Sequence, residues 1–149
     1  MDSLQIKSGK KRIQITDEDG KEKGVLEFNP SEITFIEKYQ DLLINFTEKS
    51  GEIDALRISA KDAMSGDNVR EQSDIIFTAV KELYDFFENE VDALFGVGTS
   101  SMLFSKERDV DEYTQFLEGI APFIQGERAK KLEQYAPPKR SKKRKAARL

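Results

Sequence analysis

The first apolar pattern in the chain repeats every second residue. Ile13 and Ile15 stand between polar neighbours, and Leu26 and Phe28 do the same a little later. This alternation is typical of strands that bury one face. An Asp-Gly pair between the two runs favours a tight turn, because both residues tolerate positive φ. Residues 11–28 are therefore predicted to form a β-hairpin.

The end of this hairpin carries the signals of a helix start. Asn29 can cap a helix, and Pro30 suits its first position. Phe28 and Ile33 have the spacing of a hydrophobic staple across the cap. A first helix is predicted over about residues 30–49, ended by a Ser-Gly pair. A further turn or two of helix and a polar connection would follow.

Two later segments show apolar residues at helical spacing. They predict a second helix over residues 68–95 and a third over about residues 109–135. Pro122 lies inside the third helix and is expected to bend it or split it, because proline cannot donate the helical hydrogen bond. Together with the hairpin, these segments predict three main helices.

Glycines separate the second and third helices at Gly96 and Gly98. A phosphate-binding loop would need a strand before it and a lysine beside it, and neither is present. The segment is therefore interpreted as a joint between helices, in which Thr99 or Ser100 caps a short helical turn.

The predicted fold is α+β and mainly helical, with an N-terminal hairpin and about three main helices packed as a small bundle. Residues 11–136 are expected to form a single domain. Before them, residues 1–10 are predicted to be flexible or to add a short strand. After them, residues 137–149 are predicted to be a disordered basic tail.

The composition narrows the possible chemistry. The chain has no Cys and no His, which removes thiolate chemistry, the commonest general base and the commonest transition-metal ligand. No enzyme activity, cofactor or metal site is therefore expected. Acidic residues crowd around Asp85, Glu88, Glu90 and Asp92, and a solvated helix face explains them. A carboxylate-based Mg²⁺ enzyme is the catalytic alternative. No apolar run is long enough to span a membrane.

Charge is distributed unevenly along the chain. The last twelve residues, PKRSKKRKAARL, hold seven basic side chains and no acidic one: Lys139, Arg140, Lys142, Lys143, Arg144, Lys145 and Arg148. Removing these seven from the 24 basic residues leaves 17 against 28 acidic residues, a net charge of −11. The tail fits three roles: binding nucleic-acid phosphates, a nuclear import address, or an arm that attaches to an acidic protein surface.

Large apolar residues are numerous for a chain of this size. They fit two interpretations, a well-filled core or a surplus that is exposed for binding another protein. The candidate protein-binding residues are Phe86, Phe87, Leu94, Phe95, Phe104, Phe116 and Phe123.

Several features in their order along the chain resemble a known family. They are Asn29-Pro30 after the hairpin, the joint from Phe95 to Thr99, the segment from Phe116 to Ile124, and the basic tail. Together they resemble small tail assembly chaperones of long-tailed, siphovirus-like bacteriophages and prophages of Gram-positive bacteria. The resemblance extends over roughly residues 15–145.

This resemblance implies a non-catalytic protein that coats the tape measure protein during tail assembly and keeps it soluble. The tape measure protein would be the main partner, the tail tube protein is a candidate further partner, and a homo-oligomer is expected. The protein would act in the cytoplasm of the bacterial host and be absent from the mature virion. The alternative is a small nucleic-acid-associated protein that binds phosphate backbones through its basic tail.

Overall fold

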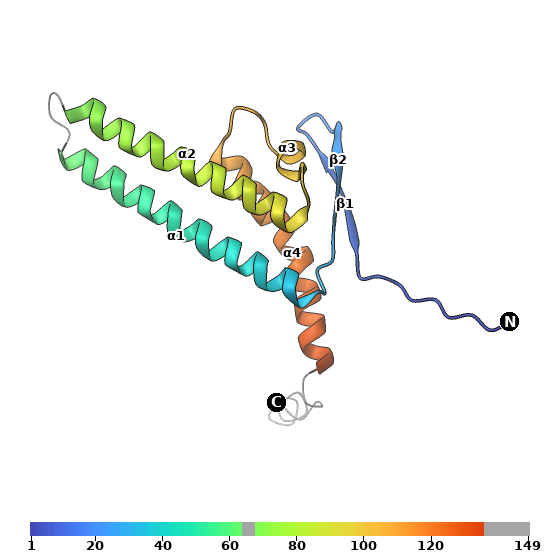
Figure 1. Ribbon diagram of the computed structural model, residues 1–149. Coiled ribbons are helices and arrows are strands. Elements are labelled where there is room, and N and C mark those ends of the chain that lie inside the picture. The colour runs from blue at the N-terminus through green and yellow to red at the C-terminus, as the bar shows by residue number, and fades with distance from the viewer. Residues whose placement is uncertain (64–67, 136–149) are drawn as a thin grey trace, which may run out of the picture.

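The structure, a computed structural model, describes residues 1–63 and 68–135 (Figure 1). A two-stranded antiparallel sheet comes first, followed by four helices. The elements are β1 (Lys11–Thr16), β2 (Glu22–Phe28), α1 (Ile33–Ala63), α2 (Asn68–Phe95), α3 (Thr99–Leu103) and α4 (Val110–Tyr135). The predicted fold class, a hairpin followed by a mainly helical bundle, is confirmed. The predicted basic tail lies outside the described residues.

The hairpin has one face toward the helices and one toward solvent. Ile13 pairs with Leu26 on the inner face, where Leu26 is buried. On the outer face the Arg12 guanidinium donates to the Glu27 carboxylate at 2.8 Å. The Asp17 carboxylate closes the turn by accepting the backbone N–H groups two and four residues later. The alternation of apolar residues thus predicted the inner face correctly.

A bulge interrupts the strand pairing next to the turn. Ile15 pairs with Gly24 and Thr16 pairs with Glu22, so that Lys23 has no partner opposite it. Bulges commonly redirect a side chain. Here the Lys23 ammonium donates to the Leu103 carbonyl oxygen at 2.9 Å and ties the hairpin to the end of α3.

The start of α1 differs from the prediction. The Asn29 side chain accepts hydrogen bonds from the Ser31 backbone and hydroxyl in a turn that precedes the helix. The expected staple is wrong, because Ile33 is exposed. Phe28 instead stacks on Phe35, with ring centroids 5.5 Å apart.

The end of α1 also corrects the sequence analysis. The helix does not end near residue 49 but continues through Gly51 to Ala63. Its buried face continues with it, through Ile53 to Ala60. A glycine inside a helix costs roughly 1 kcal/mol, and packing of this face against α2 outweighs that cost.

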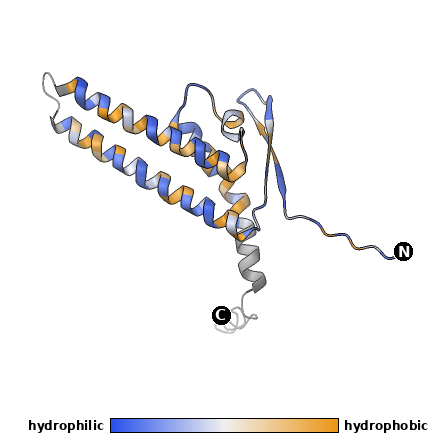
Figure 2. Ribbon diagram, in the orientation of Figure 1, coloured by the Kyte–Doolittle hydropathy of each residue, from blue (hydrophilic) through white to orange (hydrophobic). Residues whose placement is uncertain are grey.

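The two long helices α1 and α2 lie side by side and antiparallel (Figure 1). Hydrophobic residues recur along both of them (Figure 2). The bounds of α2 agree with the predicted second helix, residues 68–95. The predicted third helix is α4, and the expected split is wrong because the helix continues through Pro122. The proline is exposed, so its ring is accommodated on the solvent side.

The core has two adjoining parts. The first joins α1 to α2, α3 and α4 around Phe87 and Tyr113, both fully buried. The second packs the hairpin against α1 and α4 around Leu26 and Ile124. Phe95 contacts both parts, because its ring meets Phe28, Phe35 and Phe116 at 5.5–5.6 Å. Among the described helices, none is long and apolar enough to cross a membrane.

Candidate functional site

An open groove of about 720 Å³ lies between the hairpin and α4. We call it the hairpin–α4 groove. Its floor is apolar and includes Ile13, Ile15, Leu103, Phe104, Phe116 and Phe123. The volume falls within the usual range of about 300–1,000 Å³ for ligand pockets. It is therefore large enough to receive several side chains of a bound partner.

Simple periodicities place the floor residues together. Ile13 and Ile15 share one face of β1 because strand residues alternate between faces. Phe116 and Phe123 are seven residues apart, or about two turns of α4, and so lie on one side of that helix. Phe104, just after α3, fills the space between them and packs edge-on against Phe116.

Six carboxylates line the groove around this floor: Asp17, Glu18, Asp19, Asp109, Asp111 and Glu112. The first three belong to the hairpin turn, and the others flank the start of α4. Among the described residues that line the groove, Lys23 is the one basic side chain, and its ammonium donates a hydrogen bond to the Leu103 carbonyl oxygen. The hairpin–α4 groove thus has an acidic rim.

Half of the rim has a structural role. Asp17 closes the hairpin turn, Asp109 accepts the Asp111 backbone N–H at 2.9 Å, and Glu112 accepts the backbone N–H and hydroxyl of Ser105. The side chains of Glu18, Asp19 and Asp111 make no hydrogen bond or ion pair with any described residue. Within the described part of the chain, no group of three or more acidic residues is placed to hold a metal ion.

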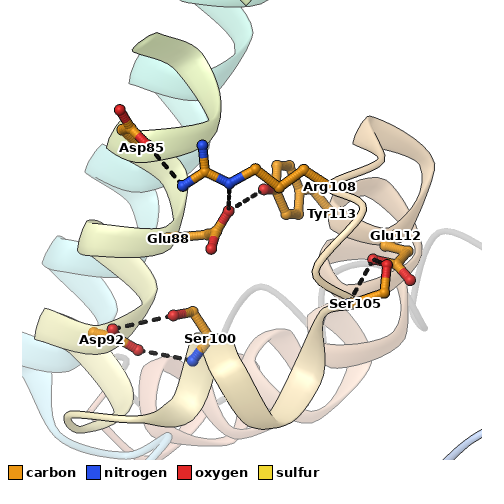
Figure 3. A network of polar contacts seen from close by, with 8 residues as sticks. All are labelled: Asp85, Glu88, Asp92, Ser100, Ser105, Arg108, Glu112 and Tyr113. Carbon is orange, nitrogen blue, oxygen red and sulfur yellow. Dashed lines mark hydrogen bonds and ion pairs between the residues drawn. The ribbon is translucent and has the colours of Figure 1, made fainter. Parts of the chain in front are cut away.

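A polar network holds the start of α4 against α2. Arg108 reaches from the loop before α4 to α2, where it contacts Asp85 at 2.7 Å and Glu88 at 3.0 Å (Figure 3). The Tyr113 hydroxyl donates to the same Glu88 carboxylate. Because α4 forms one wall of the groove, these contacts set the position of that wall.

The network changes the ionisation of its members. Burial raises the pKa of Tyr113 far above its usual range, and the hydrogen bond to Glu88 adds to this effect. The hydrogen bond to Asp85 raises the pKa of Arg108. Tyr113 is therefore neutral and Arg108 charged at any physiological pH. Both protonation states favour the contacts with Glu88.

The joint between α2 and α3 is fastened in a second way. Asp92, in the last turn of α2, accepts the Ser100 backbone N–H at 2.7 Å and the Ser100 hydroxyl at 3.1 Å (Figure 3). The prediction that Thr99 or Ser100 caps this helix is wrong. Gly98 occupies the N-cap position of α3, and no side chain at that position caps the helix. The interpretation of the segment as a joint between helices agrees with its structure.

The structure separates the candidate binding residues into two groups. Phe104, Phe116 and Phe123 line the hairpin–α4 groove, and Phe123 is 41% exposed. Phe104 is also a buried core residue, and the remaining candidates pack in the core or beside it: Phe86, Phe87, Leu94 and Phe95. Of these, Phe87 is wholly buried and not available to a partner, and Phe86 lies under the Lys49 ammonium at 5.0 Å. The seven basic residues of the tail lie outside the described residues.

Sequence reasoning missed the strand side of the groove and its rim. Ile13 and Ile15 were recognised only as strand residues of the hairpin, and of the acids in the hairpin turn only Asp19 was considered, as a turn residue. The available signal was the pair of acidic segments, TDEDG at residues 16–20 and DVDE at residues 109–112. About 90 residues separate these segments, so nothing in the sequence indicated that they face one groove.

Comparisons with known proteins identify a family. No curated protein and no solved structure matches the chain. Residues 20–147 match the protein family described as a family of unknown function, DUF6673. This match includes the α3 and α4 side of the hairpin–α4 groove and Lys23, but not Ile13, Ile15 or the three rim acids of the hairpin turn. Because the match extends over most of its length, the chain belongs to the DUF6673 family.

Proposed function

We propose that this protein is a non-catalytic tail assembly chaperone of a long-tailed bacteriophage or prophage, and that its client is the tape measure protein. The observation that supports this proposal best is the hairpin–α4 groove, which offers an apolar floor and an acidic rim to another chain. The resemblance in the sequence supports the choice of this client. The groove supplies a physical means of holding it.

The groove suits one face of an amphipathic helix. A helix with its side chains is about 10–12 Å across, so a groove of this volume takes side chains rather than a whole helix. Anchor residues at positions i, i+3 or i+4 and i+7 of a client helix would insert above Phe104, Phe116 and Phe123. Aromatic side chains provide large apolar contact areas for such anchors.

The rim restricts which helices can bind. A client with Lys or Arg beside its apolar anchors would place positive charge near Glu18, Asp19 and Asp111. A client with acidic residues there would be repelled, which contributes to specificity. The strongly acidic body, with a net charge of −11 before residue 138, would also keep a complex with an apolar client in solution.

Co-expression with the tape measure protein tests this proposal. We expect the tape measure protein to stay in the supernatant with the wild-type protein. Phe123→Glu should abolish this effect, because it places a charge on the apolar floor of the groove. Phe77→Glu is a matched control, since Phe77 is 60% exposed on α2 and does not line the groove. Equal precipitation of the client with and without the wild-type protein would contradict the proposal.

A further inference from the structure

Within the part of the chain that the structure describes, three carboxylates of the acidic rim lack a positively charged partner. Glu18, Asp19 and Asp111 are exposed and have no cationic partner among the described residues. They stand on opposite walls of the groove, two on the hairpin turn and one at the start of α4. Like charges held around one groove repel one another, and a cationic segment between them would relieve that repulsion.

The chain itself contains a segment of matching chemistry. Residues 138–149 hold seven basic side chains and no acidic ones. The methylene stems of Lys and Arg pack well on apolar surface while their charged ends reach a polar rim. We propose that the hairpin–α4 groove binds residues 138–149 of a second copy of this chain.

Chain length argues against binding within one copy. Helix α4 continues from the groove to Tyr135, so that Asp111 lies about 36 Å back along the helix from Tyr135. The densest basic run, residues 142–145, begins seven residues after Tyr135 and ends ten residues after it. Fully extended chain covers at most about 3.6 Å per residue, so this run reaches only about 25–36 Å. Within one copy, the backbone of this run therefore ends level with Asp111 only when it is fully extended, with no slack to lie across the groove.

A second copy has no such restriction, because its whole tail can enter the groove. The contact would be heterologous, since the tail of one copy meets the groove of another. In such an assembly one end copy keeps a free tail and the other end copy keeps a free groove. Further copies can therefore add at both ends. The inference concerns the same groove as the proposed function, but it does not depend on the identity of the client.

Sedimentation of the purified full-length protein, without any client, tests whether copies of the protein associate with one another. We expect concentration-dependent association that weakens by about ten-fold or more when NaCl is raised from 50 to 500 mM, because salt screens the ion pairs. Failure of this test would leave the co-expression result untouched, so the two proposals fail independently. A protein that stays monomeric at all concentrations at low salt would overturn the inference.

Two full-length variants separate the tail from the groove. The first carries Lys142→Gln, Lys143→Gln, Arg144→Gln and Lys145→Gln and keeps only a working groove. The second carries Glu18→Gln, Asp19→Asn and Asp111→Asn and keeps only a working tail. Each alone should associate at least about ten-fold more weakly than wild type. Their equimolar mixture should form a one-to-one heterodimer and nothing larger.

A matched control tests whether the position of the acids matters. Glu48→Gln, Glu52→Gln and Glu82→Gln remove the same charge from exposed sites on α1 and α2 that do not line the groove. This variant should associate as wild type does. Equal weakening in both triple variants, or a mixture of the two half-active variants that stays monomeric, would overturn the inference. So would a synthetic peptide of residues 138–149 that binds duplex DNA but not the protein.

Discussion

Two buried tyrosines show how strongly a hydroxyl group depends on its partner. The Tyr113 hydroxyl donates to Glu88, which also contacts Arg108. The Tyr39 hydroxyl is buried and has no hydrogen-bond partner among the described residues. A satisfied buried polar group supports the fold, whereas an unsatisfied one costs free energy. Removing the hydroxyl oxygen from each tyrosine therefore tests how much a hydrogen-bond partner contributes to stability.

Replacing each tyrosine by phenylalanine should have opposite effects. Tyr113→Phe removes a donor from Glu88 and should lower the free energy of unfolding by about 1–3 kcal/mol. Tyr39→Phe removes the unsatisfied hydroxyl and should leave that free energy unchanged or raise it by up to about 1 kcal/mol. Urea denaturation monitored by circular dichroism measures both. A larger loss at Tyr39 than at Tyr113 would contradict the assignment of partners.

Tyr113 also predicts how stability responds to alkaline pH. Its pKa in the folded protein is raised above the ordinary value of 10.0, chiefly by burial. The stabilisation from its neutral form is therefore fully present below pH 10 and decreases as the pH rises above that value. Between pH 10 and 11, wild type should lose more unfolding free energy than Tyr113→Phe does. Parallel pH profiles for the two proteins would contradict this prediction.

None of these partnerships could be read from the sequence. Tyr113 and Glu88 are 25 residues apart, and both looked like ordinary members of helical patterns. The crowd of acidic residues around Asp85 was interpreted as a solvated face. In the structure two of them, Asp85 and Glu88, hold Arg108, and Asp92 holds α3. The pattern of residues along one helix does not show which side chains of a distant loop contact that helix.

Among the elements, regular patterns were predicted well and interruptions were not. The hairpin and α2 follow from apolar periodicity, and their observed bounds agree with it. Gly51 was expected to end a helix and Pro122 to bend or split one, yet α1 and α4 continue through both residues, which excludes the split. In α1 the apolar stripe persists on both sides of the glycine, so packing against α2 compensates for its poor helix propensity.

Two glycines should respond to alanine in opposite ways. Gly51 lies in the middle of α1 with no heavy atom near an added Cβ, so Gly51→Ala should raise the free energy of unfolding by about 0.5–1 kcal/mol. At Gly24 an added Cβ would lie 2.8 Å from the Met102 Cγ atom, and the backbone φ is +159°. Gly24→Ala should destabilise the protein by about 1–3 kcal/mol. Thermal denaturation compares the two variants.

A double variant checks the cause of the Gly24 effect. If contact with Met102 is responsible, then Met102→Ala should cost less in the Gly24→Ala background than in wild type. Additive effects of the two substitutions would contradict this explanation. A positive coupling would show that the hairpin and α3 meet at this point, next to the bond between Lys23 and the Leu103 carbonyl.

For the whole molecule, the sequence predicted the architecture and named Phe104, Phe116 and Phe123 as candidates, but it did not indicate that they line a groove. Periodicity predicted a hairpin and a helical bundle, because the spacing of apolar residues within each segment indicates which face of that segment is buried. The hairpin–α4 groove has walls from the first and last described elements, so its shape depends on how those elements meet. The acidic rim is likewise divided between the hairpin turn and the start of α4. Charge counting showed an acidic body and a basic tail, yet it could not locate the acids in space.

The distance in sequence between the two walls has a consequence during translation. Ile13 leaves the ribosome about a hundred residues before Phe116, which at about 5–20 residues per second is a delay of about 5–20 seconds. Throughout that interval the inner face of the hairpin lacks α4, one of the two helices that cover it. The nascent chain therefore cannot capture a client in this groove until α4 has emerged, and the basic tail emerges later still.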